Sequence, residues 1–361
     1  MAGASASIPC VALNTGHAIP VLGFGTGSST TPEDLAATIL HAVRLGYRHI
    51  DTASMYGTEG AVGAAVADAV ATGAVADRAD LFITSKLVMK DAHPDRVLPA
   101  LRESLARLGL DYLDLFLIHW PLAADENNKF VPFDMEGVWR AMEECHRPGL
   151  ARSIGVSNFS AAKMSRLLAF AAVPPAVNQV ELNVGWRQEK VREVCAKNGV
   201  VVTAFSPLGA FGSMWGSNAV MESGVLQDVA ARRGKTIAQK KTKTKLRASV
   251  GITKNSSIQN VVALRWLHEQ GVCFVARSFN KDRLKQNMEL FDWELNNDDK
   301  EKIMGIPQRR ACRGDLRAPV GKVAAGQLEP QLAANFSGNN QHVQHFEETE
   351  TTAACEVNEV D

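Results

Sequence analysis

The stretch from residue 81 to residue 120 reads LFITSKLVMKDAHPDRVLPALRESLARLGLDYLDLFLIHW. It begins with a short apolar run at residues 81–86 and ends with a second run at residues 113–120. Between them, residues 94–109 carry Val97, Leu101, Leu105 and Leu108 at helical spacing. The stretch is therefore expected to fold as a strand, a helix and a second, parallel strand.

The same alternation runs through most of the chain. Short runs rich in β-branched residues predict eight strands, at residues 21–26, 49–53, 81–86, 113–120, 153–159, 176–182, 201–207 and 273–278. Segments with helical periodicity lie between them. One example is residues 32–46, where Thr31 as a cap and Pro32 in the first turn are helix-start signals. Eight such units favour a closed (β/α)8 TIM barrel of the α/β class, with a doubly wound open sheet as the alternative.

The first predicted strand ends in a glycine-rich turn, GFGTGS at residues 23–28. A dinucleotide-binding fingerprint would need a third glycine where this turn has Ser28. The turn is therefore interpreted as a tight connection rather than as the phosphate loop of an open nucleotide-binding sheet.

Charge argues against polyanionic partners. The 361 residues contain 39 Lys and Arg against 39 Asp and Glu, and the formal net charge is zero. A protein with no net charge has no general electrostatic attraction for nucleic acid or for an anionic membrane surface. We expect a small-molecule substrate, no nucleic-acid or membrane partner, and a monomer, since no segment stands out as an interface.

The termini and the cysteines bear on localisation. The amino-terminal MAGASASIPC lacks the basic start and apolar stretch of a secretory signal, and no apolar run is long enough to span a bilayer. No CxxC motif or paired spacing suggests zinc or disulfides among the six cysteines, which are Cys10, Cys145, Cys195, Cys273, Cys312 and Cys355. These features predict a cytoplasmic protein.

Two segments break the pattern, so the barrel domain is expected to span residues 1–315. Residues 240–261 carry six basic and no acidic residues and separate two halves of one predicted helix, 234–239 and 262–267. They are predicted to form a solvated loop, with a nucleic-acid or membrane patch as the alternative. Residues 316–361 are polar and aperiodic and are expected to be disordered, and His342 and His345 within them to bind no metal.

Four ionisable residues fall where predicted strands end. Asp51 ends the second strand and is followed by Tyr56, Lys86 ends the third, and His119 ends the fourth. In a parallel barrel, strand carboxyl ends meet at one mouth. Taken one at a time, each residue also has an ordinary structural interpretation. Asp51 could cap a turn, Tyr56 could pack in the core, Lys86 could lie at the surface and His119 could be a core histidine.

Together, these four residue types suit proton donation to a carbonyl. A tyrosine is a poor proton donor near neutral pH unless a nearby ammonium, here Lys86, stabilises its phenolate. Asp51 would keep Lys86 charged and in place, and His119 would orient the substrate oxygen. No metal is needed for this chemistry.

Several motifs resemble those of the aldo-keto reductases, and most closely the plant branch of that family. The general motifs are LGFGT (22–26), HIDTASMYG (49–57), SKL (85–87), IHWP (118–121) and IGVSNF (154–159). The motifs that resemble the plant branch are PCVALN (9–14), NVGWRQ (183–188) and RRACRGD (309–315). The resemblance covers roughly residues 8–315 apart from the insert; nothing in residues 316–361 resembles the usual ending.

The resemblance implies a TIM barrel that binds NADPH in extended form and passes hydride to an aldehyde or ketone. Tyr56 would be the general acid, with Asp51, Lys86 and His119 completing a tetrad. Ser157, Asn158 and Gln179 would hold the nicotinamide amide, Phe205 would stack on the ring, and further cofactor contacts would come from Gly25, Thr26, Asp51, Ser206 and Leu208.

The same resemblance places the other end of the cofactor at Arg277, Ser278, Phe279, Asn280, Arg283, Gln286 and Asn287. Arginine suits the ribose 2′-phosphate because its planar fork pairs with phosphate oxygens, which favours NADPH over NADH. The alternative is that Arg277 and Arg283 only flank a barrel helix.

Substrate contacts are predicted at an apolar wall of Met55, Trp120 and Trp215, for which ordinary core packing is the alternative. A keto acid would need cationic partners that the sequence does not identify. Two other functions stay open at this point, a plant aldehyde or ketone reductase of broad specificity and an NADPH-binding protein that has lost turnover.

Overall fold

The computed structural model describes residues 7–27, 34–210, 216–232 and 256–312. Eight parallel strands close into a barrel in the order β10-β11-β12-β3-β4-β5-β6-β9. Their bounds are β3 Leu22–Gly25, β4 His49–Asp51, β5 Phe82–Leu87, β6 Leu115–Ile118, β9 Ile154–Ser157, β10 Val177–Glu181, β11 Val201–Phe205 and β12 Cys273–Ala276. Closure confirms the (β/α)8 prediction and excludes the open sheet, and each of the eight predicted runs overlaps one barrel strand.

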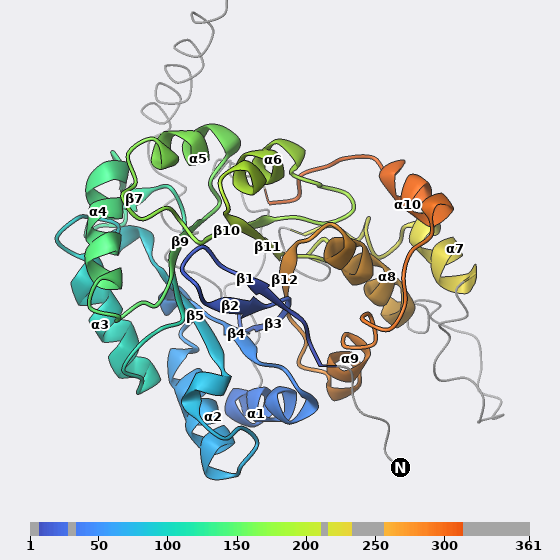
Figure 1. Cartoon of the computed structure of the whole chain (residues 1–361), viewed down its shortest axis with the longest axis horizontal. Coiled ribbons are helices and arrows are strands. Elements are labelled where there is room, and N and C mark those ends of the chain that lie inside the picture. The colour runs from blue at the N-terminus through green and yellow to red at the C-terminus, as the bar shows by residue number, and fades with distance from the viewer. Residues whose placement is uncertain (1–6, 28–33, 211–215, 233–255, 313–361) are drawn as a thin grey trace, which may run out of the picture.

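Helices surround the barrel (Figure 1). Those between successive strands pack against one another around the ring, as α1 does with α2 and α2 with α3. Their bounds are α1 Leu35–Leu45, α2 Glu59–Ala71, α3 Val97–Leu108, α4 Met135–His146, α5 Ala161–Leu168, α6 Glu189–Lys197, α7 Gly224–Arg232, α8 Ser256–Glu269, α9 Lys281–Gln286 and α10 Asn297–Met304, with 3-10 turns η1 Ser54–Tyr56, η2 Arg78–Asp80 and η3 Met89–Asp91.

Helix α1 shows how local signals set these elements. Asp34 caps its amino terminus, because the Asp34 Oδ1 accepts a hydrogen bond from the Ala37 backbone N–H at 2.8 Å. Gly46 ends the helix at φ +115°, a left-handed conformation that favours glycine. Leu35, Ile39, Ala42 and Val43 recur at helical spacing and are buried against the barrel.

The basic insert is only partly described. Residues 240–255 lie outside the described residues, as do residues 234–239 and the tail 316–361 with His342 and His345. Residues 256–261 form the first part of α8, so the prediction of a loop across 240–261 is wrong for its carboxyl-terminal end. Val261 and Val262 are both buried, and this apolar contact favours continuing the helix toward its amino end.

Two antiparallel hairpins decorate the barrel. The hairpin of β1 (Cys10–Ala12) and β2 (Ala18–Pro20) crosses the amino-terminal end of the barrel in Figure 1, and β7 (Ala123–Ala124) pairs with β8 (Phe130–Val131). In the first hairpin, Asn14 Nδ2 donates to the Pro175 carbonyl at 3.0 Å, just before β10. The hairpin therefore covers this end, and the opposite end carries the strand carboxyl termini.

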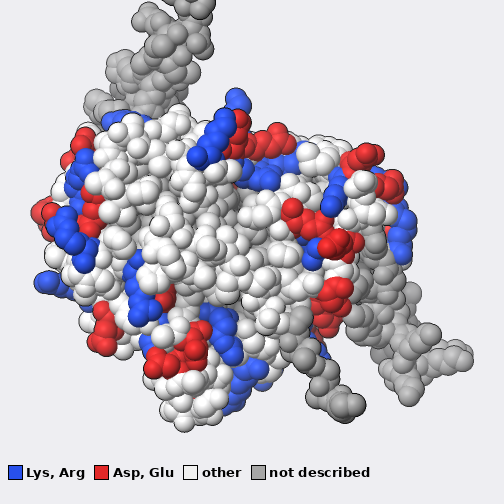
Figure 2. All heavy atoms as spheres, viewed as in Figure 1, with Lys and Arg blue, Asp and Glu red and all other residues white. Residues whose placement is uncertain are grey.

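The surface of the face viewed in Figure 2 carries no large area of one charge. Acidic and basic side chains lie interleaved over the outer helices, and the area over the hairpin is mostly free of both. Within the part of the chain that the structure describes, no helix has the length and apolar character needed to cross a membrane.

Close packing between α2 and α3 generates a stability prediction. A Cβ added at Gly63 would lie 2.1 Å from the backbone oxygen of Leu108, whereas one at Gly60 would come no closer than 4.0 Å to Arg107. We expect Gly63→Ala to destabilise the fold by about 1–3 kcal/mol through overpacking. Gly60→Ala in the same helix should raise stability by up to about 1 kcal/mol. Urea unfolding of the two variants checks this, and a Gly63→Ala protein as stable as Gly60→Ala would contradict it.

Candidate active site

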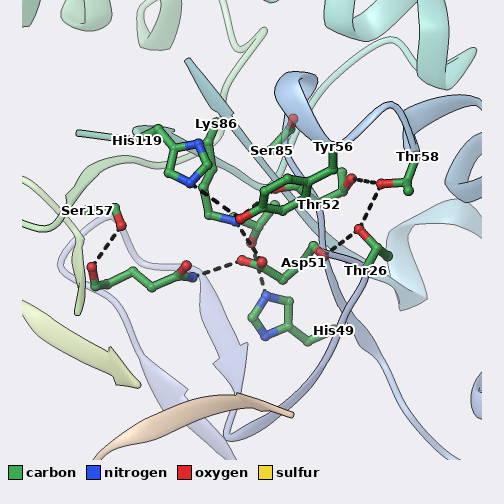
Figure 3. A network of polar contacts seen from close by, with 12 residues as sticks. Thr26, His49, Asp51, Thr52, Tyr56, Thr58, Ser85, Lys86, His119 and Ser157 are labelled. Atoms are coloured by element: carbon green, nitrogen blue, oxygen red, sulfur yellow. Dashed lines mark hydrogen bonds and ion pairs between the residues drawn. The ribbon is translucent and has the colours of Figure 1, made fainter. Parts of the chain in front are cut away.

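Polar side chains gather at the carboxyl ends of three neighbouring strands. Asp51 is the last residue of β4, Lys86 lies near the end of β5, and His119 follows β6 directly. Tyr56 ends the short turn η1 that follows β4. Figure 3 shows these four side chains pointing toward one another, so the structure brings together all four residues predicted to form the tetrad.

A buried ion pair forms the centre of this group. The Lys86 Nζ lies 2.6 Å from the Asp51 Oδ1 and donates to the Thr52 carbonyl at 2.8 Å. On the far side, Gln179 Nε2 donates to the Asp51 Oδ2 at 2.8 Å. Lys86 is 0% exposed and Asp51 3% exposed. Burial lowers the pKa of Lys86, and the Asp51 carboxylate opposes that shift.

The Tyr56 hydroxyl lies beside both the ammonium and the imidazole. It is 3.3 Å from His119 Nε2, and the two rings meet edge to face with centroids 5.6 Å apart. The Lys86 Nζ is 5.2 Å from the centre of the Tyr56 ring. A Cβ at Gly27 would come within 3.0 Å of the same ring, so glycine there lets the backbone approach the tyrosine closely.

His119 is held by its backbone and is neutral. Its N–H donates to the Leu87 carbonyl at 3.1 Å, and its carbonyl accepts from Asn158 Nδ2 at 2.9 Å. Burial lowers the pKa of His119 well below its ordinary value, and the nearby charge of Lys86 lowers it further. A neutral imidazole can hydrogen-bond to a substrate oxygen without adding a second cation beside the lysine.

The residues predicted to hold the nicotinamide amide lie on the next two strands. Ser157 ends β9, and its hydroxyl donates to the Gln179 carbonyl on β10 at 2.8 Å. Asn158 follows at φ +64°, a strained backbone for a residue other than glycine, and its amide also donates to the Ser157 Oγ at 3.1 Å. Strain of this kind is common at functional sites.

Most of the other predicted cofactor residues lie at the carboxyl ends of β11, β12 and β3. In the barrel, β11, β12 and β3 are consecutive neighbours, so their carboxyl ends form one continuous arc. Ser206 lies just after β11 at φ +50°. The predicted cofactor residues on this arc are Gly25 and Thr26 on or after β3, Phe205, Ser206 and Leu208 on or after β11, and Arg277, Ser278, Phe279 and Asn280 after β12.

The segment after β12 is ordered by its own polar groups. Asn280 caps helix α9, with Oδ1 accepting from the Arg283 N–H at 3.0 Å. Arg283 Nε donates to the buried Ser278 hydroxyl at 3.4 Å, and Arg277 Nη1 reaches the Gly27 carbonyl at 3.3 Å. Gln286 and Asn287 follow at the end of α9. Two arginines thus follow β12, one bonded to the Gly27 carbonyl and the other to the Ser278 hydroxyl.

The predicted substrate contacts are only partly placed. Met55 is half-buried in η1 directly before Tyr56, and Trp120 is half-buried with its ring stacked on His119 at a centroid distance of 6.4 Å. Trp215 lies outside the described residues.

Sequence reasoning missed a chain of hydroxyls and two buried ionisable residues. Thr58 Oγ1 lies 2.9 Å from Thr26 Oγ1 and 2.8 Å from Thr52 Oγ1. Thr58 therefore links the end of β3 to Thr52, whose carbonyl accepts a hydrogen bond from Lys86. His49 and Glu181 lie two residues from Asp51 and Gln179 on the same strands. Because side chains two apart on a strand share a face, this spacing was the available signal.

Comparison with known proteins places the chain in a family. The model of the aldo/keto reductase family matches residues 21–307. The chain is 48% identical over 311 residues to deoxymugineic acid synthase 1 of rice (Oryza sativa subsp. japonica), covering 84% of this chain and 91% of that protein. It is also 48% identical over 315 residues to rhazimal reductase 2 of Alstonia scholaris, covering 84% and 91%.

A solved structure gives the same result. The aldo-keto reductase of Bombyx mori in complex with NADP matches with a TM-score of 0.74 and 34% identity, covering 85% of this chain and 95% of that chain. The chain belongs to the aldo/keto reductase family. It is an oxidoreductase of a family that uses NADP(H), which confirms the predicted family, class of enzyme and cofactor.

The buried histidine beneath the ion pair generates a pH prediction. His49 is 1% exposed, its Nε2 lies 3.0 Å from the Thr84 hydroxyl, and burial lowers its pKa to about 4. The unfolded chain would bind this proton near pH 6.5. Stability should therefore fall as the pH drops from about 6.5 to about 4, with His49 contributing up to about 3 kcal/mol.

Urea unfolding between about pH 7 and about pH 4.5 measures this contribution. His49→Gln should reduce the loss of stability over that range, while His119 continues to act in the same direction. Thr84→Val is the matched control, since it removes the partner hydroxyl but keeps the titrating imidazole. An unchanged pH slope in His49→Gln would show that His49 does not supply the effect.

Proposed function

We propose that this protein is an NADPH-dependent carbonyl reductase in which Tyr56 protonates the substrate oxygen. The observation that carries the proposal is the position of the Tyr56 hydroxyl, 3.3 Å from His119 Nε2 and beside the buried Lys86–Asp51 pair. The family's reaction requires a proton donor at the carbonyl, and Tyr56 has the arrangement of charges that this role needs.

Each tetrad residue has a separate task. Tyr56 gives its proton to the carbonyl oxygen, and the Lys86 ammonium stabilises the phenolate that remains. Asp51 keeps Lys86 charged although both side chains are buried, and Asp51 is itself fixed by Gln179. His119, being neutral, orients the carbonyl by hydrogen bonding and leaves the proton transfer to Tyr56.

The strand ends around the tetrad have the polar groups that NADPH would need. Ser157, Asn158 and Gln179 would hold the nicotinamide amide, and the arginines Arg277 and Arg283 would pair with phosphate. Asn287 is 3% exposed, and its Oδ1 accepts no hydrogen bond within the described residues, which suits an amino group of an adenine. When bound, the cofactor supplies the hydride. The NADP complex of the silkworm relative supports this assignment.

For the substrate, we propose the 3″-keto precursor of 2′-deoxymugineic acid, which would place the enzyme in plant phytosiderophore biosynthesis and iron acquisition. The similarity to deoxymugineic acid synthases of rice, maize, barley and wheat supports this choice. The alternative is a plant reductase of broader specificity, favoured by the equal identity to rhazimal reductase 2.

We also propose that the enzyme acts in the cytoplasm as a monomer. The five cysteines in the described part of the chain are all free thiols, as expected of a reducing compartment.

The role of Tyr56 is testable by removing one oxygen atom. Tyr56→Phe should lower kcat for carbonyl reduction by about 10²–10⁴-fold, because the general acid is lost. NADPH affinity, followed by fluorescence titration, should stay within twofold. Tyr112→Phe is the matched control, since Tyr112 lies before β6 with its ring against Arg78 and Arg152, at the other end of the barrel. Wild-type turnover in Tyr56→Phe would refute the proposed acid.

The substrate proposal is tested by comparing carbonyls with the same enzyme. We expect kcat/KM for the 3″-keto acid, measured by loss of NADPH absorbance at 340 nm, to exceed that for simple aldehydes by at least tenfold. Comparable values would favour the reductase of broad specificity. Tight NADPH binding without turnover of either substrate would show a cofactor-binding protein instead.

A further inference from the structure

The last described segment of the chain, residues 305–312, is fastened to the loop that follows β10. Arg309 N–H donates to the Gly185 carbonyl at 2.6 Å. The Gln308 side chain makes two hydrogen bonds to this loop: Oε1 accepts from the Arg187 N–H at 2.7 Å, and Nε2 donates to the Val184 carbonyl at 3.1 Å. Arg187 also donates through Nη2 to the Met304 carbonyl at the end of α10 and to the Ile306 carbonyl just after it. The segment up to residue 309 therefore has anchors of its own.

The end of this segment has a different anchor, the carboxylate of Glu181. The N–H groups of Ala311 and Cys312 donate to its Oε1 and Oε2 at 3.1 and 2.7 Å. Glu181 is 3% exposed; burial raises the pKa of its carboxyl, and the two backbone N–H groups and the nearby charge of Arg310 oppose that shift. Because a buried carboxylate needs hydrogen-bond donors, these two backbone groups stabilise it and it in turn fixes them.

Strand geometry places this contact over the catalytic residues. Gln179 faces the barrel interior, since it donates to Asp51, and Glu181 lies two residues further along the same strand. Side chains two apart share a face and are separated by about 7 Å along the strand. Glu181 therefore faces the mouth one layer above Gln179, and Ala311 and Cys312 lie at that mouth.

From this geometry we infer that Glu181 is a positioning residue: its carboxylate holds Ala311 and Cys312 at the mouth, where they form one wall of the carbonyl-binding pocket. The inference rests on the proposed reductase function for the identity of that pocket. Within the described residues, the Glu181 carboxylate binds residues 311 and 312, whereas Arg187 and Gln308 hold the preceding residues independently.

Two substitutions of Glu181 separate the effect of its charge and second acceptor oxygen from the effect of its side-chain length. Glu181→Gln keeps the length of the side chain but offers one acceptor oxygen in place of two, so one backbone N–H loses its partner. Glu181→Asp keeps the charge and both oxygens on a side chain that is one methylene shorter. Glu193→Gln is the matched control, since Glu193 is an exposed residue of α6 whose carboxylate pairs with Lys197.

The first measurement does not depend on turnover. Burial and the charge of Glu181 raise the pKa of the Cys312 thiol to about 11, so it should react slowly with iodoacetamide in the wild-type protein. Peptide mapping of the full chain should show at least tenfold faster alkylation of Cys312 in Glu181→Gln, an intermediate rate in Glu181→Asp and the wild-type rate in Glu193→Gln. The buried Cys145, Cys195 and Cys273 should stay unlabelled and so report an intact fold.

The second measurement is kinetic. If residues 311 and 312 form a wall for the substrate, Glu181→Gln should raise KM for the carbonyl at least fivefold, leave kcat and the Kd for NADPH within twofold, and be partly rescued in Glu181→Asp. A freed Cys312 with an unchanged KM would overturn the wall. An unchanged alkylation rate would overturn the anchor itself.

Hydrogen exchange of the wild-type protein covers the case in which the variants do not fold. The Ala311 and Cys312 amides should be protected, and rapid exchange of both would overturn the inference without any substitution. If the wild-type enzyme reduces no carbonyl, the proposed function fails, while alkylation and hydrogen exchange still decide whether Glu181 holds the segment.

Discussion

The catalytic end of this barrel depends on one buried ion pair, between Lys86 on β5 and Asp51 on β4. Removing two charges from water costs several kcal/mol per ion, and their mutual attraction repays this only when the remaining hydrogen bonds are also made. Here the Thr52 carbonyl and the Gln179 amide complete the pair. Since β10 lies opposite β4 in the ring, the bond from Gln179 spans the barrel and fixes its two sides together.

The other parts of the site follow from that pair. The Lys86 ammonium lies beside the Tyr56 ring, and its charge helps to keep His119 neutral. Thr58 contacts the hydroxyl of Thr52, the residue whose carbonyl accepts the second hydrogen bond of Lys86. Beneath it, the buried His49 is neutral as well. Loss of Asp51 would leave a buried cation without a counter-charge, so stability and the chemistry of the site are linked through the same few atoms.

Much of the fold was predictable because its signals are local. Apolar runs such as residues 113–120 are buried on both faces, as strands of a parallel barrel are, and they alternate with amphipathic helices. Asp51, Lys86 and His119 could be selected because they end such runs. Glu181 and Thr58 were missed, because their importance lies in contacts with residues far along the chain: Cys312 is 131 positions from Glu181, and Thr26 is 32 from Thr58.

The sequence by itself determined the order of strands and helices, the family and the residue types available for proton transfer, since these depend on periodicity and on motifs of a few residues. Only the tertiary structure decided which polar atoms meet. Closing the barrel brings Gln179 across to Asp51, and the segment after α10 brings Cys312 back to Glu181. Burial then sets the protonation of His49 and His119, because desolvation depends on what surrounds a group in space and not on its neighbours along the chain.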